Sequence, residues 1–131
     1  MDNVNKIKLN DLIFKHCKQK MDLKNFIKIK DYIPYVDKMK YIDEFCEDVI
    51  NIDNGVISYN SVEKYAKGIL LILSVYTNIE FDMSFDSFDL LEKNHLTEEI
   101  LVMIPEYSTF KTFLDARFQD HLRDYVEKLN I

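Results

Sequence analysis

Apolar residues recur along most of the chain with the spacing of helices. The clearest example follows Pro34, which suits a first helical turn because it has a fixed φ and no N–H. Apolar residues there recur every three or four positions, which puts them on one face of a helix. They are Tyr35, Met39, Ile42, Cys46, Val49 and Ile50. The expected outer face comprises Asp37, Lys38, Lys40, Asp43, Glu44, Glu47 and Asp48.

A second pattern, from Asn60 to about Thr77, predicts the central helix of the fold. Asn60 followed by Glu63 has the spacing of a capping box, with Asn in place of Ser or Thr. Almost every later residue is apolar, and a helix that is apolar on nearly all sides is typically buried. Before it, residues 53–55 are expected to end the preceding helix, with Gly55 at a positive φ, and residues 56–59 to form a brief extended link.

The last third of the chain predicts three more helices. Two are short, over residues 86–94 and 98–104, and Pro105 is expected to stop the second. Ser108 is expected to cap the final helix. Its apolar stripe comprises Phe110, Phe113, Leu114, Phe118, Leu122, Tyr125, Val126 and Leu129.

The first 30 residues allow two interpretations. Residues 6–9 and 26–30 alternate polar and apolar positions, as short strands do, and they could pair as a two-stranded ribbon. Between them Asn10 would cap a helix with Leu12, Ile13, Cys17 and Met21 on its apolar stripe. The alternative is an arm that is helical throughout.

These patterns predict a mainly α fold, a compact bundle of about five helices around the central helix at about 60–77, with or without the ribbon near the N-terminus. The chain has 131 residues, two Gly and two Pro, and neither a repeat nor an interdomain linker. We therefore expect a single domain over 1–131, in which the arm at 1–30 packs on or extends from a helical body at 31–131.

Charge divides the chain unequally. Residues 1–30 contain eight Lys and three Asp, a net charge of +5, whereas residues 31–131 have a net charge of −11. The acidic body argues against direct nucleic-acid binding. For the basic arm, a solvated face is the favoured interpretation, and a contact with an anionic partner is the alternative. The most apolar run, residues 68–76, is far shorter than the roughly 20 residues of a membrane span, and the polar start predicts no signal peptide.

The sequence offers little that predicts chemistry. His16, His95 and His121 stand far apart, and Cys17 and Cys46 lack the spacing of a zinc site, so reduced thiols are expected. The phosphate-binding and nucleophile motifs rich in glycine are missing from the sequence. We therefore predict no catalytic residue, no metal site, no cofactor and no enzymatic activity.

The final helix also contains several acidic residues close to two arginines. Asp115, Asp120, His121 and Asp124 share this helix with Arg117 and Arg123. A salt-bridged surface is the favoured interpretation, and an acid–base pair of carboxylates is the alternative.

Exposed tyrosines and acidic residues are the best candidates for contacts with a partner. Tyrosine is common in protein interfaces, although a tyrosine at the margin of a core is an equally good interpretation. The predicted partner-binding residues are Tyr32, Tyr35, Tyr41, Asp43, Glu44, Glu47, Asp48, Tyr59 and Tyr107.

Four short stretches resemble a family of small bacteriophage and prophage proteins. They are residues 27–34 (IKIKDYIP, followed by Lys38, Met39 and Ile42), 76–79 (YTNI), 88–91 (FDLL) and 104–107 (IPEY). The resemblance covers roughly residues 27–107, and the arm before residue 27 departs from it. It implies a small helical accessory protein of tail assembly or of a virion module, which acts through protein contacts and has no catalytic residues to transfer.

We therefore expect a protein that binds another protein. The leading expectation is a virion or tail assembly chaperone or adaptor with a phage structural protein as partner. The alternative is an anti-defence inhibitor of the anti-CRISPR type, whose acidic surface blocks a host nuclease. Both would act in the host bacterial cytoplasm, the first with incorporation into the virion as an option, and homo-oligomers are left open.

Overall fold

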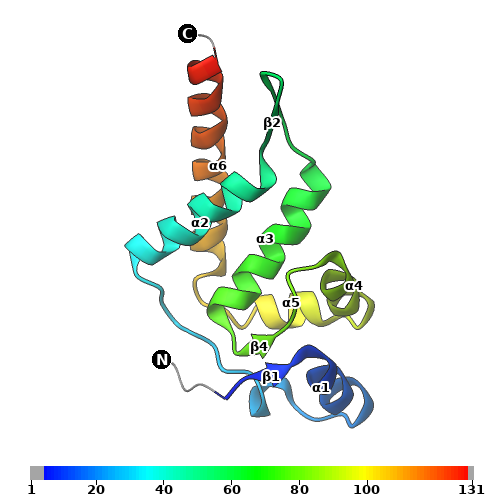
Figure 1. Cartoon of the computed structure of the whole chain (residues 1–131). Coiled ribbons are helices and arrows are strands. Elements are labelled where there is room, and N and C mark those ends of the chain that lie inside the picture. The colour runs from blue at the N-terminus through cyan, green and yellow to red at the C-terminus, as the bar shows by residue number, and fades with distance from the viewer. Residues whose placement is uncertain (1–4, 130–131) are drawn as a thin grey trace.

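The computed structural model describes residues 5–129, which form six α-helices and two small pairs of strands (Figure 1). Three long helices, α2 (Tyr35–Val49), α3 (Ser61–Tyr76) and α6 (Tyr107–Leu129), make up the elongated body. Three short ones, α1 (Leu9–Ile13), α4 (Phe85–Lys93) and α5 (Leu96–Leu101), gather near one end of α3. The prediction of a mainly helical fold is confirmed.

The helix α3 is central, as its apolar sequence predicts. Its residues Leu70, Ile72 and Leu73 are fully buried, and the helix packs on α2, α4 and α5. The side chain of Asn60 caps it by accepting hydrogen bonds from the N–H groups of Val62 and Glu63, both at 2.9 Å. Burying each of its large apolar side chains stabilises the fold by about 1.5–3 kcal/mol.

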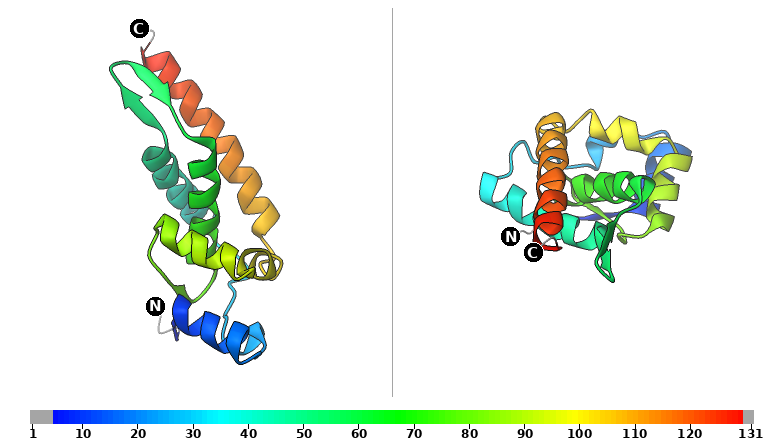
Figure 2. Two further views of the ribbon diagram at one scale, coloured as in Figure 1. Left: turned by 90° about the vertical axis from the view of Figure 1, so that its right-hand side faces the viewer. Right: turned by 90° about the horizontal axis from the view of Figure 1, so that it is seen from above.

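The first turns of α3 are less buried than the sequence predicts. Val62 is 76% exposed and Tyr65 is 53% exposed. The short helices α4 and α5 lie nearer the other end of α3 and leave its first turns less covered (Figure 1). The predicted apolar stripe of α6 is also longer than its buried part. Val126 and Leu129 are exposed where α6 extends beyond α2 and α3 (Figure 2).

The N-terminal arm packs on the end of α3, but the predicted ribbon has the wrong pairing. Strand β1 (Ile7–Lys8) lies parallel to β4 (Ile79–Glu80), with Ile7 opposite Ile79. Ile29 forms an isolated antiparallel bridge to Thr77. The two alternating runs therefore pair with the segment that follows α3 and not with each other, and a wholly helical arm is also wrong.

The buried side chain of Asn78 explains this pairing. Its Nδ2 donates to the carbonyl oxygens of Asn5 at 2.7 Å and Phe26 at 3.0 Å, and its Oδ1 accepts from the N–H of Lys28 at 2.8 Å. One amide thus satisfies backbone groups from both runs of the arm. Leu9, Leu12, Leu23 and Ile27 bring apolar side chains into the same core.

Several element ends differ from their predicted positions. Asn10 lies inside α1, which follows Lys8 directly and continues into a π-helical turn (Phe14–Lys18) and then a 3-10 turn (Leu23–Asn25). Met21, predicted on an apolar stripe, is exposed. Pro34 immediately precedes α2, as predicted, while Ser108 lies in the first turn of α6 instead of capping it.

A β-hairpin replaces the predicted helix end and extended link at residues 51–59. Helix α2 ends at Val49, and β2 (Asn51–Asp53) pairs antiparallel with β3 (Val56–Ser58). Asn54 and Gly55 between them have φ values of 51° and 78°. Two positive φ values in a two-residue loop match the twist of the flanking strands, and Asn-Gly is the pair that best tolerates them. The hairpin lies beside the C-terminal part of α6 (Figure 2).

Lys38, predicted on the outer face of α2, is buried. It is 3% exposed, and its Nζ donates to Oε2 of Glu106 at 2.7 Å. Oε1 of Glu106 accepts from the N–H of Ile33 and the hydroxyl of Tyr76, each at 2.9 Å. Position 38 lies one turn before Ile42, on the face that packs into the core, so the charged side chain follows that face inward.

The ionisation of Glu106 reflects these contacts. Burial by itself raises the pKa of this carboxyl, but hydrogen bonds from Lys38, Ile33 and Tyr76 outweigh it and lower the pKa below the ordinary value of 4.5. The rings of Tyr32 and Phe113 lie 4.6 and 5.6 Å from the Lys38 ammonium, where their faces favour a cation. Glu106 is therefore ionised, and the Lys38 ammonium lies between this carboxylate and two aromatic rings.

Glu106→Gln tests this pair. The substitution leaves the buried Lys38 ammonium without a counter-charge, so we expect the free energy of unfolding in urea to fall by about 3–5 kcal/mol.

The double variant Lys38→Met/Glu106→Gln is the control, because it removes both charges and should recover part of the loss. Equal losses in the single and double variants would contradict the role given to the ion pair.

Candidate functional site

Two predicted tyrosines form an exposed aromatic edge where α2 begins. Tyr32 is 63% exposed and Tyr35 is 61% exposed, and Val36 beside them is 75% exposed. The ring of Tyr35 packs edge-on against Phe113 of α6, with 6.2 Å between ring centroids. We call Tyr32, Tyr35 and Val36 the aromatic edge.

The aromatic edge continues into a groove between α2 and α6. The groove has a volume of about 450 Å³. It is lined by Tyr35, Met39, Asp43, Phe113, Ala116, Arg117 and Asp120. Thus the structure brings two of the predicted residues, Tyr35 and Asp43, to one surface, together with residues of α6 that the sequence did not single out as contacts.

Asp43 is engaged by side chains of its own chain. Its Oδ1 accepts from Nε of Arg117 at 2.7 Å and lies 2.9 Å from Nε2 of His121. Burial opposes the charge, but the hydrogen bonds and charges of Arg117 and His121 lower the pKa of this carboxyl. Asp43 therefore stabilises the contact of α2 with α6 in addition to lining the groove.

The remaining predicted contact residues are scattered. Glu44 and Glu47 are exposed on α2, and Asp48 accepts a hydrogen bond from Lys67 of α3 at 3.0 Å. Tyr41 is half-buried against the core, and the ring of Tyr59 packs on Phe118 with 4.8 Å between centroids.

Tyr107 lies apart from all of them, at the start of α6. The predicted set is therefore not one surface.

Two of the acidic residues of α6, Asp115 and Asp120, form the predicted salt bridges. Asp115 accepts from Lys64 at 3.1 Å and Lys111 at 2.9 Å, and Asp120 pairs with Arg123.

The buried Cys46 offers no reactive thiol. Burial, with a smaller contribution from Asp43, raises the pKa of the Cys46 thiol to about 12.

Among residues 5–129, no three His, Cys, Asp or Glu side chains gather where they could hold a metal ion. No helix in the described part of the chain has the length and apolarity needed to cross a membrane.

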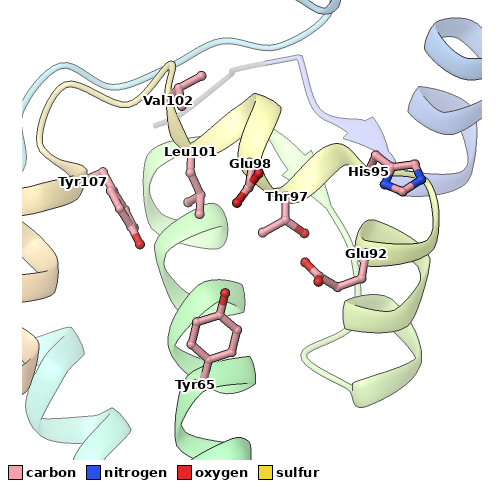
Figure 3. Close-up of a pocket in the computed structure, with 8 residues that line it drawn as sticks. All are labelled: Tyr65, Glu92, His95, Thr97, Glu98, Leu101, Val102 and Tyr107. Atoms are coloured by element: carbon pink, nitrogen blue, oxygen red, sulfur yellow. The ribbon is translucent and has the colours of Figure 1, made fainter.

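A pocket larger than the groove between α2 and α6 lies elsewhere, where α3, α4, α5 and the start of α6 meet (Figure 3). Its volume is about 680 Å³, within the range of ligand-binding pockets. We call it the α3–α5 pocket. It is lined by Tyr65, Glu92, His95, Thr97, Glu98, Leu101, Val102 and Tyr107.

Local backbone geometry positions the walls of the α3–α5 pocket. His95 takes a left-handed conformation, with φ at 56°, and so turns the chain sharply from α4 into α5. Leu91, Leu96 and Ile100 are fully buried and hold both short helices against the core. Tyr65 packs edge-on against Phe88 of α4, with 6.2 Å between centroids. The polar side chains at the pocket therefore stand on packed helices.

Polar groups converge in this pocket. The hydroxyl of Tyr65, the side chain of Thr97 and the carboxylates of Glu92 and Glu98 point into the same space, whereas the ring of His95 points away (Figure 3). Burial raises the pKa of the Tyr65 hydroxyl, the charges of Glu92 and Glu98 raise it further, and the charge of Lys111 opposes them. The two carboxylates make the lining of the pocket acidic.

Thr97 has an unusual position at the floor of the pocket. The residue is 3% exposed, and its hydroxyl oxygen has no hydrogen-bond partner. A buried hydroxyl without a partner costs about 1–3 kcal/mol. Such a group is therefore a place where stability is lost and where a ligand can supply the missing hydrogen bond.

Of the residues that line this pocket, only Tyr107 was predicted from the sequence as a contact residue. Tyr65 reads as a core position of the central helix, and Glu98 reads as an acidic residue in a first helical turn. The packing of α4 and α5 on α3 brings them together with Glu92 and Thr97.

Thr97→Val tests the unpartnered hydroxyl. Replacing it by a methyl group removes the cost of burying it, so we expect the free energy of unfolding to rise by about 1 kcal/mol or more.

Thr77→Val is the matched control. The hydroxyl of Thr77 is also buried, but it donates to the carbonyl of Leu73 at 2.6 Å and accepts from the N–H of Ile79 at 3.2 Å. This variant should lose stability. A loss of stability in Thr97→Val would contradict the assignment.

Comparison with known protein families, curated proteins and solved structures finds no match to this chain. The resemblance to small phage proteins therefore stays a prediction, and the function is argued from the surfaces described above.

Proposed function

We propose that this chain is a non-enzymatic protein-binding module of bacteriophage or prophage origin, an accessory protein in virion or tail assembly. The observation that supports binding is the aromatic edge, Tyr32, Tyr35 and Val36, beside the groove between α2 and α6. The resemblance over residues 27–107 supports the phage origin and the assembly role.

The aromatic edge has the properties of an interface. Large side chains that are more than 60% exposed gain free energy when a partner covers them, and tyrosine is enriched among the residues that dominate binding. Met39 and Phe113 extend the apolar surface into the groove, while Arg117 and Asp120 supply a polar rim. An apolar centre with a polar rim is typical of protein interfaces.

The acidic face of α2 favours the alternative, an anti-defence inhibitor. Glu44 and Glu47 are exposed one turn apart, and such a face could complement the basic groove of a host nuclease. Acidic helical surfaces are common, so the assembly role is preferred.

Complementation of a gene deletion in the phage tests the proposal. The deletion should leave incomplete particles, and the wild-type gene should restore them. Tyr35→Ala/Val36→Ser removes the centre of the aromatic edge, so we expect binding to a phage structural protein to weaken about 30-fold or more and complementation to fail.

Val62→Ser is the control, since Val62 is equally exposed, at 76%, and lies on α3 outside the groove. Normal particle yield after the deletion would contradict the assembly role. If such a deletion instead made the phage sensitive to a host nuclease, it would favour the inhibitor.

A further inference from the structure

The α3–α5 pocket presents hydrogen-bond acceptors and negative charge. The carboxylates of Glu92 and Glu98 accept hydrogen bonds but donate none when ionised, and the oxygen of Thr97 has free lone pairs. Among the described residues that line the pocket there is no Lys or Arg. A positively charged ligand with several N–H donors would satisfy all of these groups.

The walls of the pocket favour a flat cation. Tyr65 and Tyr107 both line the pocket, and aromatic rings attract cations and stack on planar guanidinium groups. Contact with Phe88 holds the ring of Tyr65 in place. A guanidinium has five N–H donors in one plane, which suits two carboxylates and a hydroxyl better than the compact ammonium of lysine.

A metal ion fits this site less well. Only two carboxylates line the pocket, and no group of three potential ligands occurs within residues 5–129. The volume of about 680 Å³ is also far larger than one ion needs, whereas it accommodates a long side chain.

The surroundings of the pocket indicate that the cation belongs to a protein. Val102 at the pocket is 82% exposed, so apolar surface is available to residues next to the bound side chain. A second pocket of about 190 Å³ shares Tyr65 and runs between α3 and α6, past Gly68, Ile69 and Leu114. A chain that places one side chain in the first pocket can place its next residues over the second.

We propose that the α3–α5 pocket binds an arginine side chain of a partner protein, with Glu92 and Glu98 pairing with the guanidinium, Tyr65 stacking on it and Thr97 accepting a hydrogen bond at the floor. This proposal shares with the proposed function the premise that the ligand is a protein, but it uses residues outside the aromatic edge. The chain would then contact a partner at two separate places.

Amide NMR spectra of the full chain test the pocket with three capped tripeptides, Gly-Arg-Gly, Gly-Lys-Gly and Gly-citrulline-Gly. Citrulline keeps the shape of arginine without its charge. With the arginine peptide we expect saturable chemical-shift changes at Tyr65, Glu92, Thr97 and Tyr107. The lysine peptide should bind more weakly, and the citrulline peptide should bind with an affinity lower by about tenfold or more.

Variants of the two carboxylates show whether the pocket is the site. The double variant Glu92→Gln/Glu98→Gln should bind the arginine peptide with an affinity lower by at least about tenfold, because charge-assisted hydrogen bonds are lost. Glu99→Gln is the matched control, since Glu99 adjoins Glu98 on α5 but faces His16, 3.4 Å away. It should bind as the wild type does.

Three outcomes would overturn the proposal. They are equal binding of the citrulline peptide, unchanged binding by Glu92→Gln/Glu98→Gln, and shifts centred on Glu44 and Glu47 of α2. These experiments distinguish the pocket proposal from the proposed function. If the chain does not bind the arginine peptide but still binds a phage structural protein through the aromatic edge, only the pocket proposal fails. If the chain binds the arginine peptide but does not bind a phage structural protein, only the role of the aromatic edge fails.

Discussion

The buried ion pair between Lys38 and Glu106 is the contact on which the arrangement of the long helices depends. Lys38 belongs to α2, Glu106 directly precedes α6, and Tyr76 at the end of α3 donates to the same carboxylate. An ammonium and a carboxylate cannot be buried at low cost unless each finds partners in good geometry. The three helices are therefore fixed relative to one another at one point.

This point also positions both candidate binding surfaces. The groove between α2 and α6 begins at Tyr35 and Phe113, whose rings pack on each other, and the ring of Phe113 lies 5.6 Å from the Lys38 ammonium. Tyr107 of the α3–α5 pocket directly follows Glu106. Most side chains of the two candidate surfaces are thus exposed, while the ion pair that orients their helices is buried. Features that cost stability, such as the unpartnered hydroxyl of Thr97 and the left-handed backbone of His95, occur at the pocket and not at the ion pair.

The sequence predicted the helices well because their apolar spacing reports directly on burial. The central helix, its Asn60 cap and the start of α2 after Pro34 all follow from local patterns. Lys38 does not lie on the outer face that its charge predicts, because its position one turn before Ile42 places it on the buried face of α2. The hairpin at residues 51–58 was missed although Asn54-Gly55 is a strong turn signal. Pairing of the arm with β4, and the α3–α5 pocket, depend on contacts between segments distant in the chain, which no local pattern encodes.

An NMR titration of the side-chain carboxyl groups tests the central contact most directly. If Glu106 is ionised and held by Lys38, its pKa must lie below the ordinary value of 4.5, despite the opposing effect of burial. The stabilisation from this group is then present above pH 4.5 and is lost as the pH falls through the lowered pKa. A pKa for Glu106 at or above 4.5 would contradict the account, because burial would then outweigh the ion pair.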